Sequence, residues 1–140
     1  MVWSTIKFLT LNSTLLIMFL VVGCSGELSP QAATGKALYE THCAACHGLN
    51  GEGQPNWKIP DARGVYPAPP HNNDGHTWHH ADTLLLEIMA NGGSLPTSAM
   101  PGFKDKVTLA EMEAILVYLK TMWGPEQLEF QRQVTENSKK

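Results

Sequence analysis

Apolar residues recur at helical spacing in three stretches of the chain, and the most regular of these lies near the C-terminus. Thr108 and Glu111 form the pattern of a capping box, which predicts the start of a helix that continues to about Trp123. The residues 125–140 that follow are polar, and they predict either a short helix or a frayed tail. The apolar positions of the predicted helix are three or four residues apart, as on one buried face: Met112, Ile115, Leu116, Leu119 and Met122.

Two further helices are predicted upstream. Pro30 and the helix-forming residues after it indicate a helix over about residues 31–43. Residues 82–91 are helical in composition, and the pair Gly92-Gly93 that follows them is a strong C-terminal stop signal. Leu85 and Ile88 are spaced so that they face the core.

A continuous apolar run, Leu15–Val22, precedes these helices. It has about the length of a signal-peptide core and is short for a membrane span. The run ends in Val-Val-Gly-Cys, which resembles the lipobox of bacterial lipoproteins, although Leu is commoner than Val at its first position. The resemblance implies a signal peptide at 1–23, a lipidated Cys24, a tether at 24–29 and a place on the periplasmic face of a bacterial membrane. A plain cleaved signal peptide and an uncleaved membrane helix stay open as alternatives, and each of the three exports the protein.

The chemistry of the chain is concentrated in the run Cys43-Ala44-Ala45-Cys46-His47. Two cysteines three residues apart with a histidine directly after them are typical of a covalent attachment site for a c-type haem. Each thiol adds to one vinyl group of the porphyrin, and the histidine on the same turn becomes the proximal iron ligand. A redox dithiol and a zinc site are the alternatives, but the sequence offers neither a βαβ pattern nor a second ligand pair. Cys24 is then left without a disulfide partner.

The residues around this motif resemble the opening of class I cytochromes c. In that family a glycine and an aromatic residue precede the haem cysteines at four-residue spacing, as Gly35 and Tyr39 do here. The resemblance covers about residues 30–123 and implies a small all-α cytochrome c fold, with three main helices and long loops wrapped around one covalent haem. It implies that Tyr118 lies where the last helix crosses the first, and it gives a domain at 30–124 with 125–140 as a polar tail.

Met100 is the expected sixth ligand of the iron. Pro101 holds Met100 in an extended conformation on a segment between two helices, from which its thioether can project. The Met-Pro step also matches the axial-methionine loop of class I cytochromes c. A thioether opposite His47 favours reduced iron and fills the position where oxygen or peroxide binds. The alternative for Met100 is a core-filling methionine, and Met89 is expected to have that packing role because it lies on an apolar helical stripe.

Residues 48–77 are rich in Gly, Pro and Asn and are long for an unsupported loop in a compact domain. A buried haem gives such a loop a core on which to pack. Some of its polar groups are candidates to donate hydrogen bonds to the haem propionates, and a solvent-facing position is the alternative for each. These candidates are Arg63, Tyr66, Trp78 and the backbone amides around Gly64.

Histidines gather just before the second predicted helix. A surface role is expected for them, and whether they bind a secondary metal stays an open question. His42 is also expected at the surface, because His47 takes the proximal position. Asp82 or Thr77 is the expected N-cap of the helix. The clustered histidines are His71, His76, His79 and His80.

The chain carries 10 Lys and Arg against 13 Asp and Glu, a formal net charge of −3. Because no basic stripe exists to neutralise phosphates, nucleic-acid binding is not expected. The charge is compatible with a redox donor and acceptor that dock through basic patches. No nucleophile-base set is apparent, so the expected function is one-electron transfer in an extracytoplasmic chain and not catalysis. The alternatives are a haem-bearing subunit of a membrane oxidase or dehydrogenase and a haem protein that binds a gas or peroxide.

Overall fold

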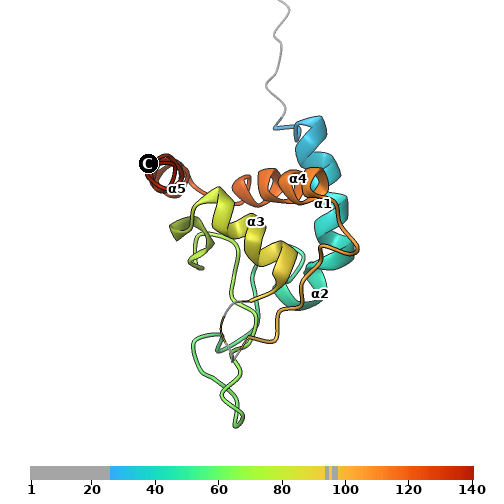
Figure 1. Cartoon of the computed structure of the whole chain (residues 1–140), viewed down its shortest axis with the longest axis vertical. Coiled ribbons are helices and arrows are strands. Elements are labelled where there is room, and N and C mark those ends of the chain that lie inside the picture. The colour runs from blue at the N-terminus through green and yellow to red at the C-terminus, as the bar shows by residue number, and fades with distance from the viewer. Residues whose placement is uncertain (1–25, 94, 96–97) are drawn as a thin grey trace, which may run out of the picture.

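The helices of the computed structural model follow one another without any strand in the residues that it describes, which are 26–93, 95 and 98–140. In chain order they are α1 (Pro30–His42), α2 (Ala44–His47), the 3₁₀ turn η1 (Thr77–His79), α3 (Asp82–Asn91), α4 (Leu109–Lys120) and α5 (Pro125–Asn137) (Figure 1). The all-α fold class is confirmed. The predicted signal peptide, lipobox and Cys24 lie outside the described residues.

Helix α4 lies at the centre of the fold, where it crosses α1 and also contacts α3 (Figure 1). The predicted capping box is present, because the Thr108 side chain accepts from the backbone N–H of Glu111 and the Glu111 carboxylate accepts from that of Thr108. The buried face is confirmed at Met112, Ile115, Leu116 and Leu119, while Met122 is half-buried. The helix ends at Lys120, three residues before the predicted end.

The crossing of α1 and α4 brings two backbones into contact. A Cβ added at Gly35 would lie 1.9 Å from the carbonyl oxygen of Ala114, so only glycine permits this approach. One turn further along α1, the fully buried Tyr39 ring meets Tyr118 edge to face, with centroids 5.5 Å apart. The expected position of Tyr118 at the crossing of this helix with the first is therefore confirmed, and Gly35 meets Ala114 and Ile115 there.

The predicted N-cap of α3 is wrong. Ala81 occupies the N-cap without a side-chain hydrogen bond, Asp82 is the first helical residue, and Thr77 belongs to η1. The Asp82 carboxylate instead pairs with the ammonium of Lys120 at 2.8 Å. It also accepts from the amide of Gln131, so it connects α3 to α4 and α5.

Residues 125–137 form a helix, so the first of the two alternatives for this segment is confirmed. Helix α5 packs against η1, where the Phe130 ring meets the Trp78 ring edge to face at 5.6 Å. With the short α2, it brings the α-helices of the described residues to five, against the three main helices expected. Among the described residues, the longest apolar helical stretch falls short of what is needed to cross a bilayer.

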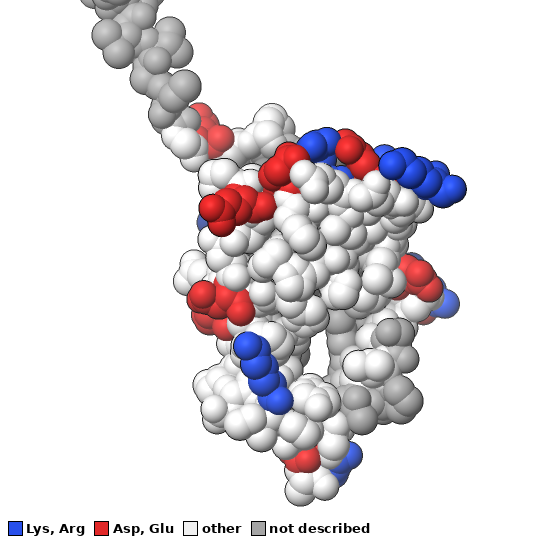
Figure 2. Space-filling model, turned by 90° about the vertical axis from the view of Figure 1, so that its left-hand side faces the viewer, with Lys and Arg blue, Asp and Glu red and all other residues white. Residues whose placement is uncertain are grey.

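Charges of both signs lie close together on the surface. On the face shown in Figure 2, Lys and Arg side chains are scattered among Asp and Glu around an uncharged centre, and they do not form a basic stripe.

Candidate cofactor-binding site

The two thiols of the Cys-x-x-Cys-His run lie on one short helical turn. The backbone N–H groups of Cys46 and His47 both donate to the carbonyl of Cys43, at 3.1 and 3.0 Å. The turn ends at Gly48, whose φ of 79° favours glycine. Both cysteines are free; Cys46 is exposed, whereas Cys43 is half-buried and lines a cavity. Burial, followed by the neighbouring Cys46, raises the pKa of the Cys43 thiol to about 11.

His47 follows on the same turn, and its side chain is buried, with the residue 6% exposed. Its Nδ1 lies 2.9 Å from the carbonyl oxygen of Pro69. Since a carbonyl only accepts, Nδ1 carries the proton and Nε2 keeps its lone pair. Burial lowers the pKa of His47, against the opposing effect of the Pro69 hydrogen bond, and so favours the neutral imidazole. A neutral imidazole whose second nitrogen is held by a carbonyl is the usual form of a metal-ligating histidine.

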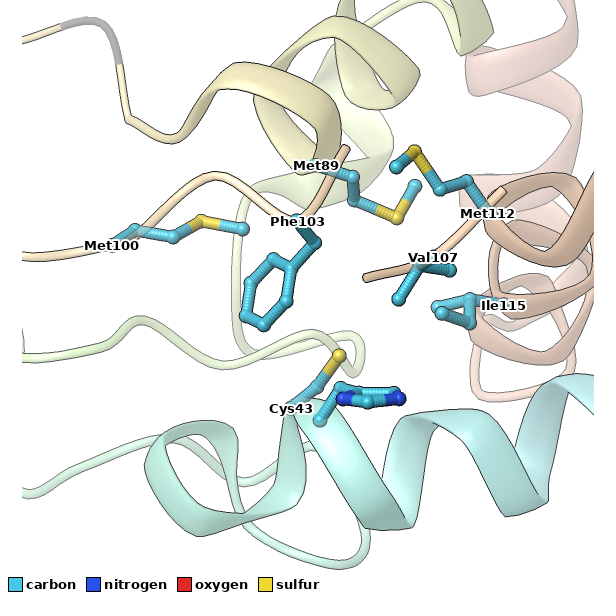
Figure 3. Close-up of a pocket in the computed structure, with 8 residues that line it drawn as sticks. Cys43, Met89, Met100, Phe103, Val107, Met112 and Ile115 are labelled. Carbon is cyan, nitrogen blue, oxygen red and sulfur yellow. The ribbon is translucent and has the colours of Figure 1, made fainter. Parts of the chain in front are cut away.

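The cavity beside Cys43 is bounded by sulfur and hydrocarbon groups. Met89 enters from α3, Met100 from the segment after α3, and Cys43 from the junction of α1 and α2 (Figure 3). The remaining lining residues are His42, Phe103, Val107, Met112 and Ile115. Such walls suit an apolar group, and of the residues in the Cys-x-x-Cys-His run only Cys43 lines the cavity.

Two buried N–H or ring nitrogen groups have no hydrogen-bond partner among the described residues. They are the indole nitrogen of Trp78 and Nδ1 of His76. Unpaired buried donors are costly and need an explanation. The carboxylates of a haem would supply an acceptor of the required kind for the Trp78 indole, and the apolar walls with the Cys43 thiol among them suit the ring itself.

None of the predicted propionate contacts, Trp78 included, lines the cavity. Arg63 forms a two-pronged ion pair with Asp61, at 3.1 Å from Nε and 2.9 Å from Nη2, and its side chain is 81% exposed. Tyr66 is exposed, and the amide of Gly64 donates to the Asp61 carbonyl at 2.9 Å. In this structure Arg63 and the amide of Gly64 stabilise the turn at Asp61, and Trp78 keeps a buried donor without a partner.

The expected exposure is confirmed for His79, whereas His71 is half-buried, with its ring against that of His47. The His71 ring stacks on the His47 ring with centroids 4.0 Å apart and planes 22° apart. Burial, with the neighbouring His47 and His76, lowers the pKa of His71 well below its usual value. His76 and His80 are half-buried. No group of three or more His, Cys, Asp or Glu side chains within the described ranges is placed to hold a metal ion.

His42 is also less exposed than expected. It is half-buried, lines the cavity and meets the edge of the Phe103 ring at 6.1 Å. Phe103 and the carbonyl of Pro69 were not among the predicted site residues. A main-chain carbonyl acts through its position alone, so the residue type of Pro69 carries no signal of this role.

The described residues form a helical domain with two thiols on one turn, a buried neutral histidine and an apolar cavity. These features are those of a protein that holds a flat cofactor covalently at its edge. Residues 32–123 match the family model described as Cytochrome c, and the chain belongs to this family. Membership implies covalently bound haem c and a role as a haem-binding electron carrier. No curated protein matches the chain.

Proposed function

We propose that this protein is a class I, monohaem, one-electron carrier. Cys43 and Cys46 would hold the haem through thioether bonds, and Nε2 of His47 would be the proximal ligand. The observation that carries the proposal is the hydrogen bond from Nδ1 of His47 to the Pro69 carbonyl, on the same turn as two free thiols. A single haem follows from the cysteine count, because Cys24 is the only other cysteine among the 3 in the chain. Bound haem supplies the ferrous–ferric couple.

Met100 is the proposed sixth ligand. Its segment is fixed to the end of α3, since the N–H of Gly93 donates to the Met100 carbonyl at 3.2 Å and the N–H of Phe103 donates to the Met89 carbonyl at 3.0 Å. A Cβ at Gly102 would lie 2.7 Å from the carbonyl oxygen of Ala90, so the two segments approach closely. The Met100 side chain lines the cavity from this fixed backbone. A thioether ligand there would leave no open coordination position, which favours electron transfer over gas or peroxide chemistry.

Met89 lines the same cavity and provides a matched control for Met100. We expect the oxidised wild-type protein to show the methionine-to-iron charge-transfer band and the reduced protein to resist carbon monoxide. Met100→Leu should lose the band, bind carbon monoxide and have a lower midpoint potential, because the thioether stabilises ferrous iron. Met89→Leu should keep all three properties, since a volume-conserving change in the core is tolerated.

Ready binding of carbon monoxide by the wild-type protein would contradict the carrier proposal and favour the gas- or peroxide-binding alternative. Loss of the band in Met89→Leu, with retention in Met100→Leu, would exchange the roles of the two methionines.

We also propose that Cys24 is lipidated after export and that the domain works on the periplasmic face of a bacterial membrane. The support is the apolar run Leu15–Val22 before Cys24 and the absence of a disulfide partner for that cysteine once the other two hold haem. Cys24→Ser should move the haem-loaded protein from the membrane fraction to the soluble fraction with an unchanged spectrum. Retention of Cys24→Ser in the membrane would favour an uncleaved helix.

A further inference from the structure

The hydrogen bond to Pro69 is an incomplete constraint on the His47 imidazole. It sets the direction of the Nδ1–H bond at a distance of 2.9 Å, but the ring can still tilt about that direction. A second contact, on the face of the ring, is needed to define the ring plane. The His71 imidazole supplies a face at 4.0 Å and within 22° of parallel.

His71 is itself fixed through both its backbone and its side chain. Its N–H donates to the Gly51 carbonyl at 2.7 Å, and its carbonyl accepts from the indole N–H of Trp123 at 2.7 Å. Its Nδ1 lies 2.8 Å from the Oγ1 of Thr77. These partners come from the long loop, from η1 and from the residues after α4, so three separate segments hold one ring in place.

The Tyr39 ring also packs against the His71 ring. Its centroid is 6.1 Å from that of His71 in an edge-on arrangement, and its hydroxyl donates to the Gly48 carbonyl at 2.8 Å. Tyr39 is fully buried in the α1–α4 crossing. The position of the His71 ring is therefore tied to the best-packed part of the molecule.

We propose that His71 is a positioning residue that fixes the plane of the His47 imidazole. The inference rests on the proposed function, because it takes His47 as the iron ligand. Residues that orient a metal-ligating histidine from outside the ligand shell adjust the properties of the metal. In low-spin ferric haem, the plane of the axial imidazole determines how the unpaired electron is distributed over the porphyrin, which makes that plane measurable.

The test compares haem-loaded full-length variants by proton NMR of the oxidised haem methyl groups and by electron paramagnetic resonance. His71→Leu removes the flat face, whereas His71→Phe keeps a flat ring and loses the Thr77 contact. Thr77→Val keeps His71 but removes the group that fixes its ring. His79→Leu is the control, because His79 is an exposed histidine outside this contact.

We expect His71→Leu to change the order or spread of the haem methyl shifts and the g values. His71→Phe should restore most of the wild-type pattern. Thr77→Val should change the methyl shifts and g values in the same direction as His71→Leu, by a smaller amount. Thermal unfolding of each variant separates this effect from a loss of stability. If His71→Leu does not load haem, the Thr77→Val spectrum decides.

Spectra of His71→Leu and Thr77→Val that match His79→Leu, even with a lower unfolding temperature, would overturn the positioning role and leave the proposed function standing. A wild-type protein without a histidine-ligated low-spin haem would overturn both.

Discussion

Gly35 is the residue on which the crossing of α1 and α4 most directly depends. The atoms that a Cβ would meet are the main-chain oxygen and carbon of Ala114, at 1.9 and 2.5 Å. A flexible side chain can move away from such a clash, but the backbone inside α4 cannot do so without displacing the helix. The separation of α1 and α4 is therefore set at this position.

We predict that Gly35→Ala lowers the free energy of unfolding by about 1–3 kcal/mol or more, the range for overpacking of a close-packed interior. Denaturant unfolding of the haem-loaded protein measures this change. Gly26→Ala is the control, because a Cβ at Gly26 meets nothing within 4 Å, and it should stay within about 0.5 kcal/mol of wild type. Equal stability of Gly35→Ala and wild type would mean that the two helices can separate without cost.

At the scale of single residues, the sequence predicted the residues of the haem motif and of the α1 face better than it predicted the residues that contact His47. The Cys-x-x-Cys-His spacing and the four-residue interval between Gly35 and Tyr39 are local patterns with direct structural meaning. The stacking of His71 on His47 and the Pro69 hydrogen bond join residues that are more than 20 positions apart. Contacts of that kind depend on how the loop folds, so no short motif contains them.

Helix α5 is held by a buried polar side chain. Gln131 is 2% exposed, and its amide nitrogen donates toward the His80 carbonyl at 3.2 Å and Oγ1 of Thr135 at 3.0 Å, as well as toward the Asp82 carboxylate. The N–H of Asp82 donates to Oγ1 of Thr135 at 3.1 Å. Polar groups thus join α5 to the start of α3, where α5 has few apolar residues to offer.

We predict that Gln131→Leu lowers the free energy of unfolding by about 1–3 kcal/mol, because it leaves the His80 carbonyl and the half-buried Asp82 carboxylate without this donor. Denaturant unfolding of the haem-loaded protein is the measurement. Gln133→Leu, two residues further on the exposed side of α5, loses only a surface contact to Glu129 and should change stability by less than about 0.5 kcal/mol. A Gln131→Leu protein as stable as Gln133→Leu would show that water replaces the lost donor.

At the scale of elements, apolar periodicity predicted α3 and α4 well and left α5 undecided. Residues 82–91 match α3 at both ends, and the capping box marks the start of α4. The N-cap of α3 was missed because the best capping residue, Asp82, is taken up by Lys120 and Gln131 on other helices. Tertiary partners thus overrode a local preference that is worth only about 1 kcal/mol.

Over the whole molecule, several histidines are held in environments that disfavour protonation. Burial is the main cause of the lowered pKa of His71, His76 and His80, and neighbouring histidines add to it. Below the unfolded-state value of about 6.5, the unfolded chain therefore binds more protons than the folded protein. The stabilisation by neutral histidines is complete above that pH and is lost as the pH falls.

We predict that the free energy of unfolding of the haem-loaded protein is nearly constant down to about pH 6.5 and decreases as the pH falls from there to about 5. Guanidinium unfolding at closely spaced pH values measures the slope. The double variant His76→Gln/His80→Gln should show a shallower slope, because two of the titrating groups are removed and neither contacts the proposed iron ligands. A flat profile in the wild-type protein would contradict the burial of these rings.

The all-α class and the family were within reach of the sequence, since one motif and three periodic stretches are enough to define them. The path of residues 48–76 was not. This segment is ordered by contacts such as His71 with Gly51 and Trp123, which form only once the helices have met. Composition identified it as a loop around a cofactor but did not indicate that its turn at Asp61 and Arg63 would lie apart from the cavity lining.

The acceptor for His47 belongs to the peptide backbone, and this limits how inherited variation can act on the protein. Replacing Pro69 by another amino acid changes a side chain but leaves a carbonyl in the main chain, so point mutation cannot delete that hydrogen-bond acceptor outright. Mutations that alter the orientation of the His47 ring must therefore act through its neighbours. A single substitution at His71 would change the ring that stacks on His47. A population of such proteins adapting to a new redox partner would have more freedom at position 71 than at position 69.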